Sequence, residues 1–136
     1  YGGDLLVERY IPGRELTVAV LEGQAMAVTE IRPEVGFYDF RAKYSEGYAR
    51  HVVPAELPDE ITAICLDWAE RAHAVLGCRG VSRADFRYDE SQGADGIYLL
   101  EVNTQPGMTP MSLVPEQAAH RGIAFDDLVV RLVEIA

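Results

Sequence analysis

Two acidic residues and one amide lie where two predicted strands come together, and their oxygens could hold a divalent cation. Asp85 belongs to the segment SRADF, and Glu101 and Asn103 interrupt the apolar run YLLEVN two residues apart. A charge buried at the end of an apolar strand is costly unless something compensates it. Carboxylate and amide oxygens suit a hard ion such as Mg²⁺, which usually keeps room for water and substrate phosphates. The pattern therefore predicts a magnesium site.

The pairing of the two strands decides whether these oxygens meet. If the strands pair antiparallel about Gly93, Asp85 faces Glu101 and Arg83 faces Asn103. Side chains alternate along a strand, so all four point to one face, with opposed Cβ atoms about 5 Å apart. Opposed carboxylates repel each other unless one is protonated or a cation lies between them. Arg83 adds a fork of donors that suits a phosphate or an oxyanion.

An ion-pair interpretation of the same residues stays open. Asp85 and Glu101 could pair only with Arg83 and Arg87 at the rim of the sheet, without a metal. The register is also sensitive, because a slip of one residue moves every side chain of a strand to the other face. The segment YDESQGADG between the two acids is long for a tight turn.

The elements that position these residues form a mixed pattern of strands and helices. Strands are predicted over residues 5–11, 15–21, 25–32, 48–54, 79–89 and 96–103, with a turn at Pro12 and Gly13. The clearest helix covers 57–77, capped by Asp59 and ended by Gly77. Its predicted apolar face consists of Ile61, Ile64, Cys65, Trp68, Ala72, Val75 and Leu76. Two short helices follow at 115–122 and 125–136, the second capped by Asp126. The pattern predicts an α+β fold, an antiparallel sheet with flanking helices.

The composition is that of one soluble domain. The chain has 136 residues, of which 49% are hydrophobic and 25% charged, and no apolar run approaches the roughly 20 residues of a membrane span. The net charge of −10 repels nucleic acids and anionic membranes, so neither is an expected partner. The start of the chain resembles no signal peptide and has no initiator Met, so we expect a piece of a longer protein.

The two cysteines, Cys65 and Cys78, have no metal-ligand spacing. A disulfide between them is open by count, but buried reduced thiols are the expected state and suit the cytoplasm. His51, His73 and His120 are expected to be structural or surface residues, and Met108 and Met111 are expected to pack a loop.

Several motifs resemble, in order, those of the D-alanine–D-alanine ligases of the ATP-grasp superfamily. SRADF followed by YLLEVNTQPGMTPMSLVP is similar to the family's C-terminal signature, FYDFRAKY to its ω-loop, and VERYIPGRELTVAVL to its nucleotide-contacting strand and hairpin. The resemblance implies that ATP phosphorylates the carboxylate of one D-alanine and that the amino group of a second attacks the acyl phosphate. The products would be ADP, phosphate and D-alanyl-D-alanine for peptidoglycan synthesis.

The resemblance implies roles around the phosphates. Asp85, Glu101 and Asn103 match the ligands of two Mg²⁺ or Mn²⁺ ions. Arg83 matches the arginine that stabilises the acyl phosphate and the tetrahedral intermediate. Gly107 matches a glycine whose backbone N–H contributes to the oxyanion hole.

It also implies how the chain holds the second D-alanine and closes the site. Ser112, through its hydroxyl, and Leu113, through its N–H, match the positions that bind the acceptor carboxylate. Lys43 matches the lysine that contacts the transferred phosphate, and Tyr44 the tyrosine that helps to close the loop. This Lys-Tyr pair favours an amine over a hydroxy acid as the acceptor. The alternative for Lys43 is an ordinary solvated side chain.

The nucleotide would lie against the start of the chain. Glu8, Arg9 and Ile11 match the segment that contacts adenine, and Glu15 matches the acid on the ribose hydroxyls. Arg9 stands where the family commonly has lysine. Exposed strand residues are the alternative for Glu8 and Glu15.

The family's enzymes are longer, with N-terminal and central domains, and commonly form homodimers. Residues 1–136 are therefore expected to be one C-terminal ATP-grasp domain that by itself binds ATP weakly and does not turn over. Two other functions stay open: another ATP-grasp amino-acid ligase, and a non-enzymatic module that binds a partner through an acidic face.

Overall fold

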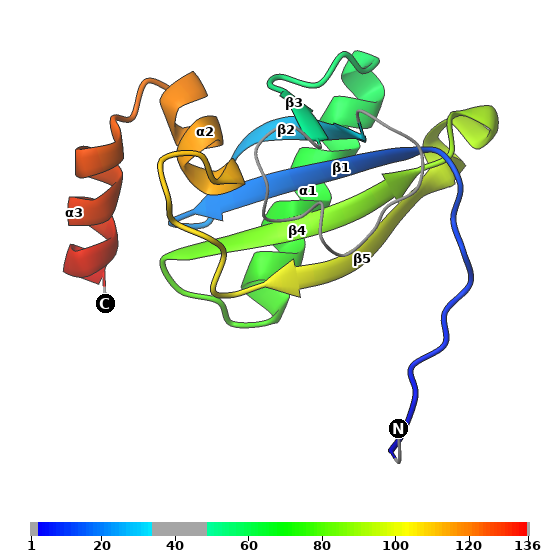
Figure 1. Cartoon of the computed structure of the whole chain (residues 1–136), viewed down its shortest axis with the longest axis horizontal. Helices are drawn as coiled ribbons and strands as arrows, with labels where there is room; N and C mark the ends of the chain where they lie inside the picture. The colour runs from blue at the N-terminus through cyan, green and yellow to red at the C-terminus, as the bar shows by residue number, and fades with distance from the viewer. Residues whose placement is uncertain (1–2, 34–48, 136) are drawn as a thin grey trace.

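A five-stranded antiparallel sheet forms the centre of the chain, which the computed structural model describes over residues 3–33 and 49–135 (Figure 1). The strands are β1 (Arg14–Leu21), β2 (Gln24–Pro33), β3 (Ala49–Val52), β4 (Val81–Tyr88) and β5 (Ile97–Asn103). Their order is β3-β2-β1-β4-β5, and all neighbours are antiparallel. The helices are α1 (Asp59–Val75), α2 (Leu113–His120) and α3 (Phe125–Ile135).

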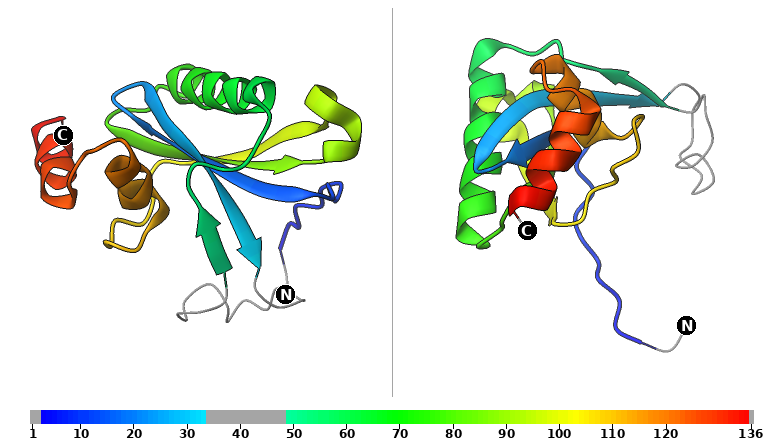
Figure 2. Two further views of the ribbon diagram at one scale, coloured as in Figure 1. Left: turned by 90° about the horizontal axis from the view of Figure 1, so that it is seen from above. Right: turned by 90° about the vertical axis from the view of Figure 1, so that its left-hand side faces the viewer.

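The helices lie on opposite faces of this sheet (Figure 2). On one face α1 covers a core that includes Leu16, Val18, Phe86 and Cys65. On the other face α2 and α3 complete a smaller core, made of Ala19, Leu21, Met26, Val114, Ala118 and Leu128. Because α2 covers only one end of its face, the rest of that face is left to polar side chains.

Strand β4 shows how the sequence divides the two faces. Ser82, Ala84, Phe86 and Tyr88 are buried, whereas the residues between them are half-buried. This period of two places the arginines and Asp85 on the face that α1 does not cover. The alternation of SRADFR therefore determines which face of the sheet is polar.

Strands β4 and β5 are joined by two short 3₁₀ turns over Glu90–Gly96, separated by a kink at Gly93, where the sequence predicted only a segment too long for a tight turn. The Asp89 N–H donates to the Gly96 carbonyl at 2.9 Å and closes the hairpin. Phe86 pairs with Leu99 while Asp85 pairs with Glu101, so Leu100 is an extra residue in β5. This bulge shifts the register of the ladder by one residue between the long connection and the acids.

The strand predicted over residues 5–11 is wrong. Residues 3–10 are exposed and have no regular structure, and they run away from the sheet (Figure 1). Leu5, Leu6 and Val7 have the β-branched or apolar character of a strand, but no described strand pairs with them. A strand former without a partner strand has no ladder to join.

The other strand predictions hold, and the predicted helices differ in detail. Pro58, not Asp59, is the N-cap of α1, and Asp126 lies inside the first turn of α3. Val75 and Leu76, predicted on the buried face of α1, are 85% and 63% exposed; His73 is buried instead and bonds Ser82 at 2.8 Å. No described helix is long and apolar enough to cross a membrane.

Candidate active site

The predicted register is confirmed at the two pairs that matter for chemistry. Asp85 lies opposite Glu101, and Arg83 lies opposite Asn103. Glu101 is exposed, and the other three residues are half-buried. The bulge at Leu100 lies outside this stretch, so the four side chains share the polar face of the sheet.

Asp85 is held by two neighbours. Nε and Nη2 of Arg83 donate to its two carboxylate oxygens at 2.8 and 2.7 Å, and the Thr17 hydroxyl donates to Oδ1 at 2.6 Å. These hydrogen bonds to Asp85 raise the pKa of Arg83 against the effect of burial, and Glu101 and Glu15 add to the rise. Arg83 therefore stays charged beside two acids, within reach of any anion on this face.

The ion-pair alternative is realised only in part. Arg83 does pair with Asp85, but Arg87 does not join them. Arg87 donates to the carbonyls of Ile11 and Gly13 at 3.0 and 2.7 Å and lies 3.8 Å from Glu15. It ties the segment just before β1 to β4 rather than neutralising the acids.

Thr17 was not singled out from the sequence, although it lies at the centre of the polar face. It is fully buried and stands between Asp85 on β4 and Thr29 on β2. The Thr29 hydroxyl is buried and has no hydrogen-bond partner among the described residues. The alternation in ELTVAVL could have marked Thr17 as the polar residue next to the acids once the strand order was known.

Asn103 leads from the sheet into the loop that ends at α2. Its Oδ1 accepts from the Gln105 N–H at 2.9 Å. Further along, a Cβ on Gly107 would lie 3.1 Å from the Ser112 Oγ, so the backbone there approaches the serine closely. The Ser112 hydroxyl accepts from the Thr109 N–H at 3.1 Å and contacts the Thr109 hydroxyl at 2.9 Å. The structure thus places Gly107 against the turn from Thr109 to Ser112.

Helix α2 begins at that turn. Ser112 is its N-cap and Leu113 its first residue, so the free N–H groups of the helix point toward the loop. Such an N-terminus favours a carboxylate. His51 on β3 contacts Glu116 in the first turn of α2 at 2.9 Å. Met108 packs against the smaller core, whereas Met111, expected to pack the loop, is 79% exposed.

The donor set of the paired strands fits a magnesium ion in its chemistry. It comprises two carboxylates and one amide oxygen, and a carboxylate has about four lone-pair positions, so Asp85 can bind a cation while Arg83 holds it. Among the described residues there is no group of three or more His, Cys, Asp or Glu side chains that could hold a metal. A site here therefore depends on Asn103 and on ligands from a substrate.

The residues predicted to contact the nucleotide are spread along the start of the chain. Glu8 and Arg9 are exposed, Ile11 is 8% exposed, and Glu15 is half-buried on β1. Lys43 and Tyr44 lie outside the described residues.

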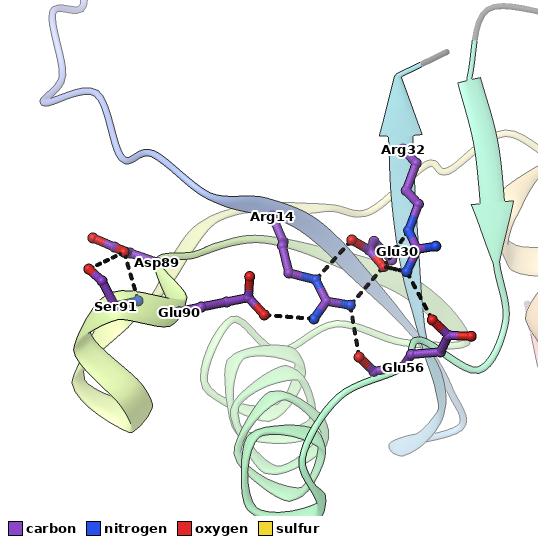
Figure 3. A network of polar contacts seen from close by, with 7 residues as sticks. All are labelled: Arg14, Glu30, Arg32, Glu56, Asp89, Glu90 and Ser91. Carbon is purple, nitrogen blue, oxygen red and sulfur yellow. Dashed lines mark hydrogen bonds and ion pairs between the residues drawn. The ribbon is translucent and has the colours of Figure 1, made fainter.

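A network of arginines and glutamates lies at one end of β1 and β2, and sequence reasoning missed it (Figure 3). Arg14 binds both oxygens of Glu30 at 2.8 and 2.7 Å and also reaches Glu90 at 3.1 Å. Arg32 binds Glu30 at 2.7 Å and Glu56 at 3.3 Å. No short motif marks these residues, because they come from β1, β2, the β3–α1 connection and the β4–β5 connection and meet only in the folded chain.

Comparison with known proteins places this geometry in context. The sequence model of the family described as "D-ala D-ala ligase C-terminus" matches residues 1–134. The chain is 63% identical over 133 residues to a D-alanine–D-alanine ligase of Cereibacter sphaeroides and 59% identical over 133 residues to one of Erythrobacter litoralis. These matches cover 98% of the chain but only 43% and 41% of the relatives.

Solved structures agree with the sequence comparison. The fold matches a crystal structure of the D-alanine–D-alanine ligase of Bacillus anthracis complexed with ATP, with a TM-score of 0.77 and 30% identity. It matches a D-alanyl-alanine synthetase A of Vibrio cholerae with the same TM-score and 34% identity. These matches cover 94% of the chain and about two fifths of each structure, 41% and 40%.

Proposed function

The chain belongs to the family of D-alanine–D-alanine ligase C-terminal domains, with the α+β fold predicted for an ATP-grasp lobe, and we propose that it acts within a longer enzyme of that activity. That enzyme would join two D-alanines with ATP, through an acyl phosphate, to D-alanyl-D-alanine for peptidoglycan. This chain would supply the part of the site that handles phosphates, the oxyanion and the acceptor carboxylate.

One observation carries the proposal: Asp85 and Glu101 oppose each other beside the pair of Arg83 and Asn103. An arginine and two acids on one face suit a reaction in which charge moves between phosphate oxygens and a carboxylate. Asp85, Glu101 and Asn103 would hold Mg²⁺ or Mn²⁺, two ions by family resemblance. When bound, the metal would neutralise negative charge on the phosphates.

The chain's own residues have distinct tasks in this proposal. The guanidinium of Arg83 donates to the oxygens of the acyl phosphate and of the tetrahedral intermediate. The Gly107 N–H donates to the same oxyanion, and glycine lets the backbone come close to the reacting carbon. The Ser112 hydroxyl and the Leu113 N–H bind the carboxylate of the second D-alanine, whose amino group attacks the acyl phosphate and releases phosphate.

Three further expectations concern residues at the edges of the site. Glu8, Arg9 and Ile11 would contact adenine, Glu15 the ribose, and Lys43 the transferred phosphate.

The reach of the chain alone is limited. It spans about two fifths of the length of the relatives it matches, 41% and 43%. We expect the isolated chain to bind MgATP weakly and to form no dipeptide, because a nucleotide held from one side loses half its contacts. Calorimetry with MgATP tests this, and micromolar affinity of the chain alone would contradict it.

The deciding experiment measures D-alanine-dependent phosphate release from ATP by the full-length enzyme. Asp85→Asn and Glu101→Gln should abolish phosphoryl transfer. Unchanged function in both variants would favour a non-enzymatic acidic module instead. Rates with D-serine and D-lactate as acceptors, compared with D-alanine, separate this ligase from other ATP-grasp ligases. Size measurements of the same enzyme test the expected homodimer.

A further inference from the structure

A break in the β1–β2 ladder is filled by a side chain from α2. Val18 pairs with Val28, but Val20 pairs with Ala25, so β2 carries one extra residue opposite Ala19. At this bulge the Ala19 N–H donates to Oε1 of Gln117 at 2.8 Å, and Nε2 of Gln117 donates to the Thr17 carbonyl at 3.2 Å. The side-chain amide of Gln117 therefore accepts from one backbone N–H of β1 and donates to one backbone carbonyl of the same strand.

Gln117 is fully buried and belongs to the helix that starts at the predicted acceptor positions. It lies four residues after Leu113, so the two side chains lie on neighbouring turns of the same helix face. Val114 and Ala118 pack on the smaller core beside it. Apolar packing alone lets a helix shift along the sheet by fractions of an ångström. Two hydrogen bonds to a strand backbone fix both the position of the helix along that strand and its rotation about its own axis.

Thr17 connects Gln117 to Asp85 through its backbone carbonyl on one side and its side-chain hydroxyl on the other. Its carbonyl accepts from Gln117, and its hydroxyl donates to Asp85 Oδ1 at 2.6 Å. Asp85 is in turn held by Arg83 through both carboxylate oxygens. A short chain of hydrogen bonds thus joins the helix that begins at Ser112 to the acid and arginine of the opposed pairs.

We propose that Gln117 is a positioning residue that, through Thr17, sets the separation between the acceptor-binding end of α2 and the phosphate-binding pair of Asp85 and Arg83. This inference rests on the proposed function. Attack on an acyl phosphate requires the acceptor amine at a defined distance, and a misplacement of about 1 Å can cost roughly a hundredfold in rate. Gln117 touches no reacting atom, so it acts only through the geometry of the helix.

The test uses the full-length enzyme with Gln117→Met, which keeps the length of the side chain but removes both hydrogen bonds. We expect kcat/KM for the second D-alanine to fall about tenfold or more, chiefly through kcat, while the KM for ATP changes less than about twofold. The matched control is His120→Met, an exposed position at the end of the same helix, which should change neither constant. A purely structural role would lower the unfolding temperature and the amount of active enzyme but leave kcat/KM for the acceptor, per active enzyme, unchanged.

Thr17 provides a second route if Gln117→Met does not fold. Thr17→Val keeps the shape but removes the hydroxyl, and Thr17→Ser keeps the hydroxyl. We expect Val to lower kcat/KM for the acceptor about tenfold and Ser to restore most of it. Unchanged acceptor constants in folded Gln117→Met, or equal effects of Val and Ser, would overturn the inference. Failure of the unmodified enzyme to release phosphate with D-alanine would instead overturn the proposed function.

Discussion

Glu30 should be one of the most costly charges to remove from this fold, because it is buried between two arginines. Its side chain is 7% exposed and that of Arg14 15%, and Arg14 grips both carboxylate oxygens (Figure 3). Glu30→Gln keeps the size but leaves Arg14 without its main counter-charge. Breaking one side of a buried pair costs about 3–5 kcal/mol. Arg14 keeps Glu90 and the Glu56 carbonyl, so we expect about 3 kcal/mol.

Urea and thermal unfolding of the chain would measure this loss. For a chain of this size, about 3 kcal/mol corresponds to a fall of roughly 10 °C in Tm. Glu56→Gln is the matched control, since Glu56 is 78% exposed and pairs with the same Arg32. An exposed pair contributes about 1 kcal/mol or less. Equal losses in the two variants would refute the claim that burial makes Glu30 important.

The acid response of Glu30 gives an independent check. Burial raises its pKa, but hydrogen bonds from Arg14 and Arg32 outweigh burial and set it below the ordinary value of 4.5. The unfolded chain therefore takes up this proton at higher pH than the folded one. The stabilisation is complete above pH 4.5 and is lost as the pH falls through the lowered folded value. Glu30→Gln should lose that part of the acid dependence.

Three other predictions concern single positions. Gly13→Ala should lower the free energy of unfolding by about 3 kcal/mol or more, because φ is +100° and a Cβ would lie 2.1 Å from the Tyr88 carbonyl oxygen. Gly23→Ala, with open space around it, should lower it by about 1 kcal/mol, both measured by urea unfolding. Thr29→Val should stabilise the fold by about 1 kcal/mol in the same assay, since it removes a buried hydroxyl that lacks a partner among the described residues; a loss would reveal a partner for that hydroxyl. Burial raises the pKa of Cys65 to about 11, so a thiol reagent at pH 8 should label Cys78 and spare Cys65 until urea is added.

The sequence carried the opposed pairs of the site but not the contacts around them. Centring the hairpin on Gly93 predicted the pairing of Asp85 with Glu101, but that pairing also depends on the bulge at Leu100, since Phe86 pairs with Leu99 nearer the tip. Thr17 and Gln117 could not be found in that way. Their roles depend on which strand lies beside β4 and on a bulge that α2 fills, and both are set by tertiary packing.

Local signals failed where a partner was needed. Residues 5–11 have strand-forming composition but lie beside no described strand. Asp59 and Asp126 have capping chemistry, yet α1 starts one residue and α3 two residues earlier than these caps would require, so both acids fall in the first turn. There they still favour the helix through its dipole. Helix ends shift easily by one or two residues because the cap and the first turn accept the same residue types.

The extra residue at Leu100 makes the pairing of the acids independent of the length of the hairpin. The ladder has one register on the tip side of Leu100 and another at the acids. The number of residues in one part of β5 therefore does not set the pairing in the other part. A residue gained or lost near the tip can be taken up at this position without exchanging the faces of the sheet. Alignment gaps among related sequences should therefore gather between Asp89 and Leu100.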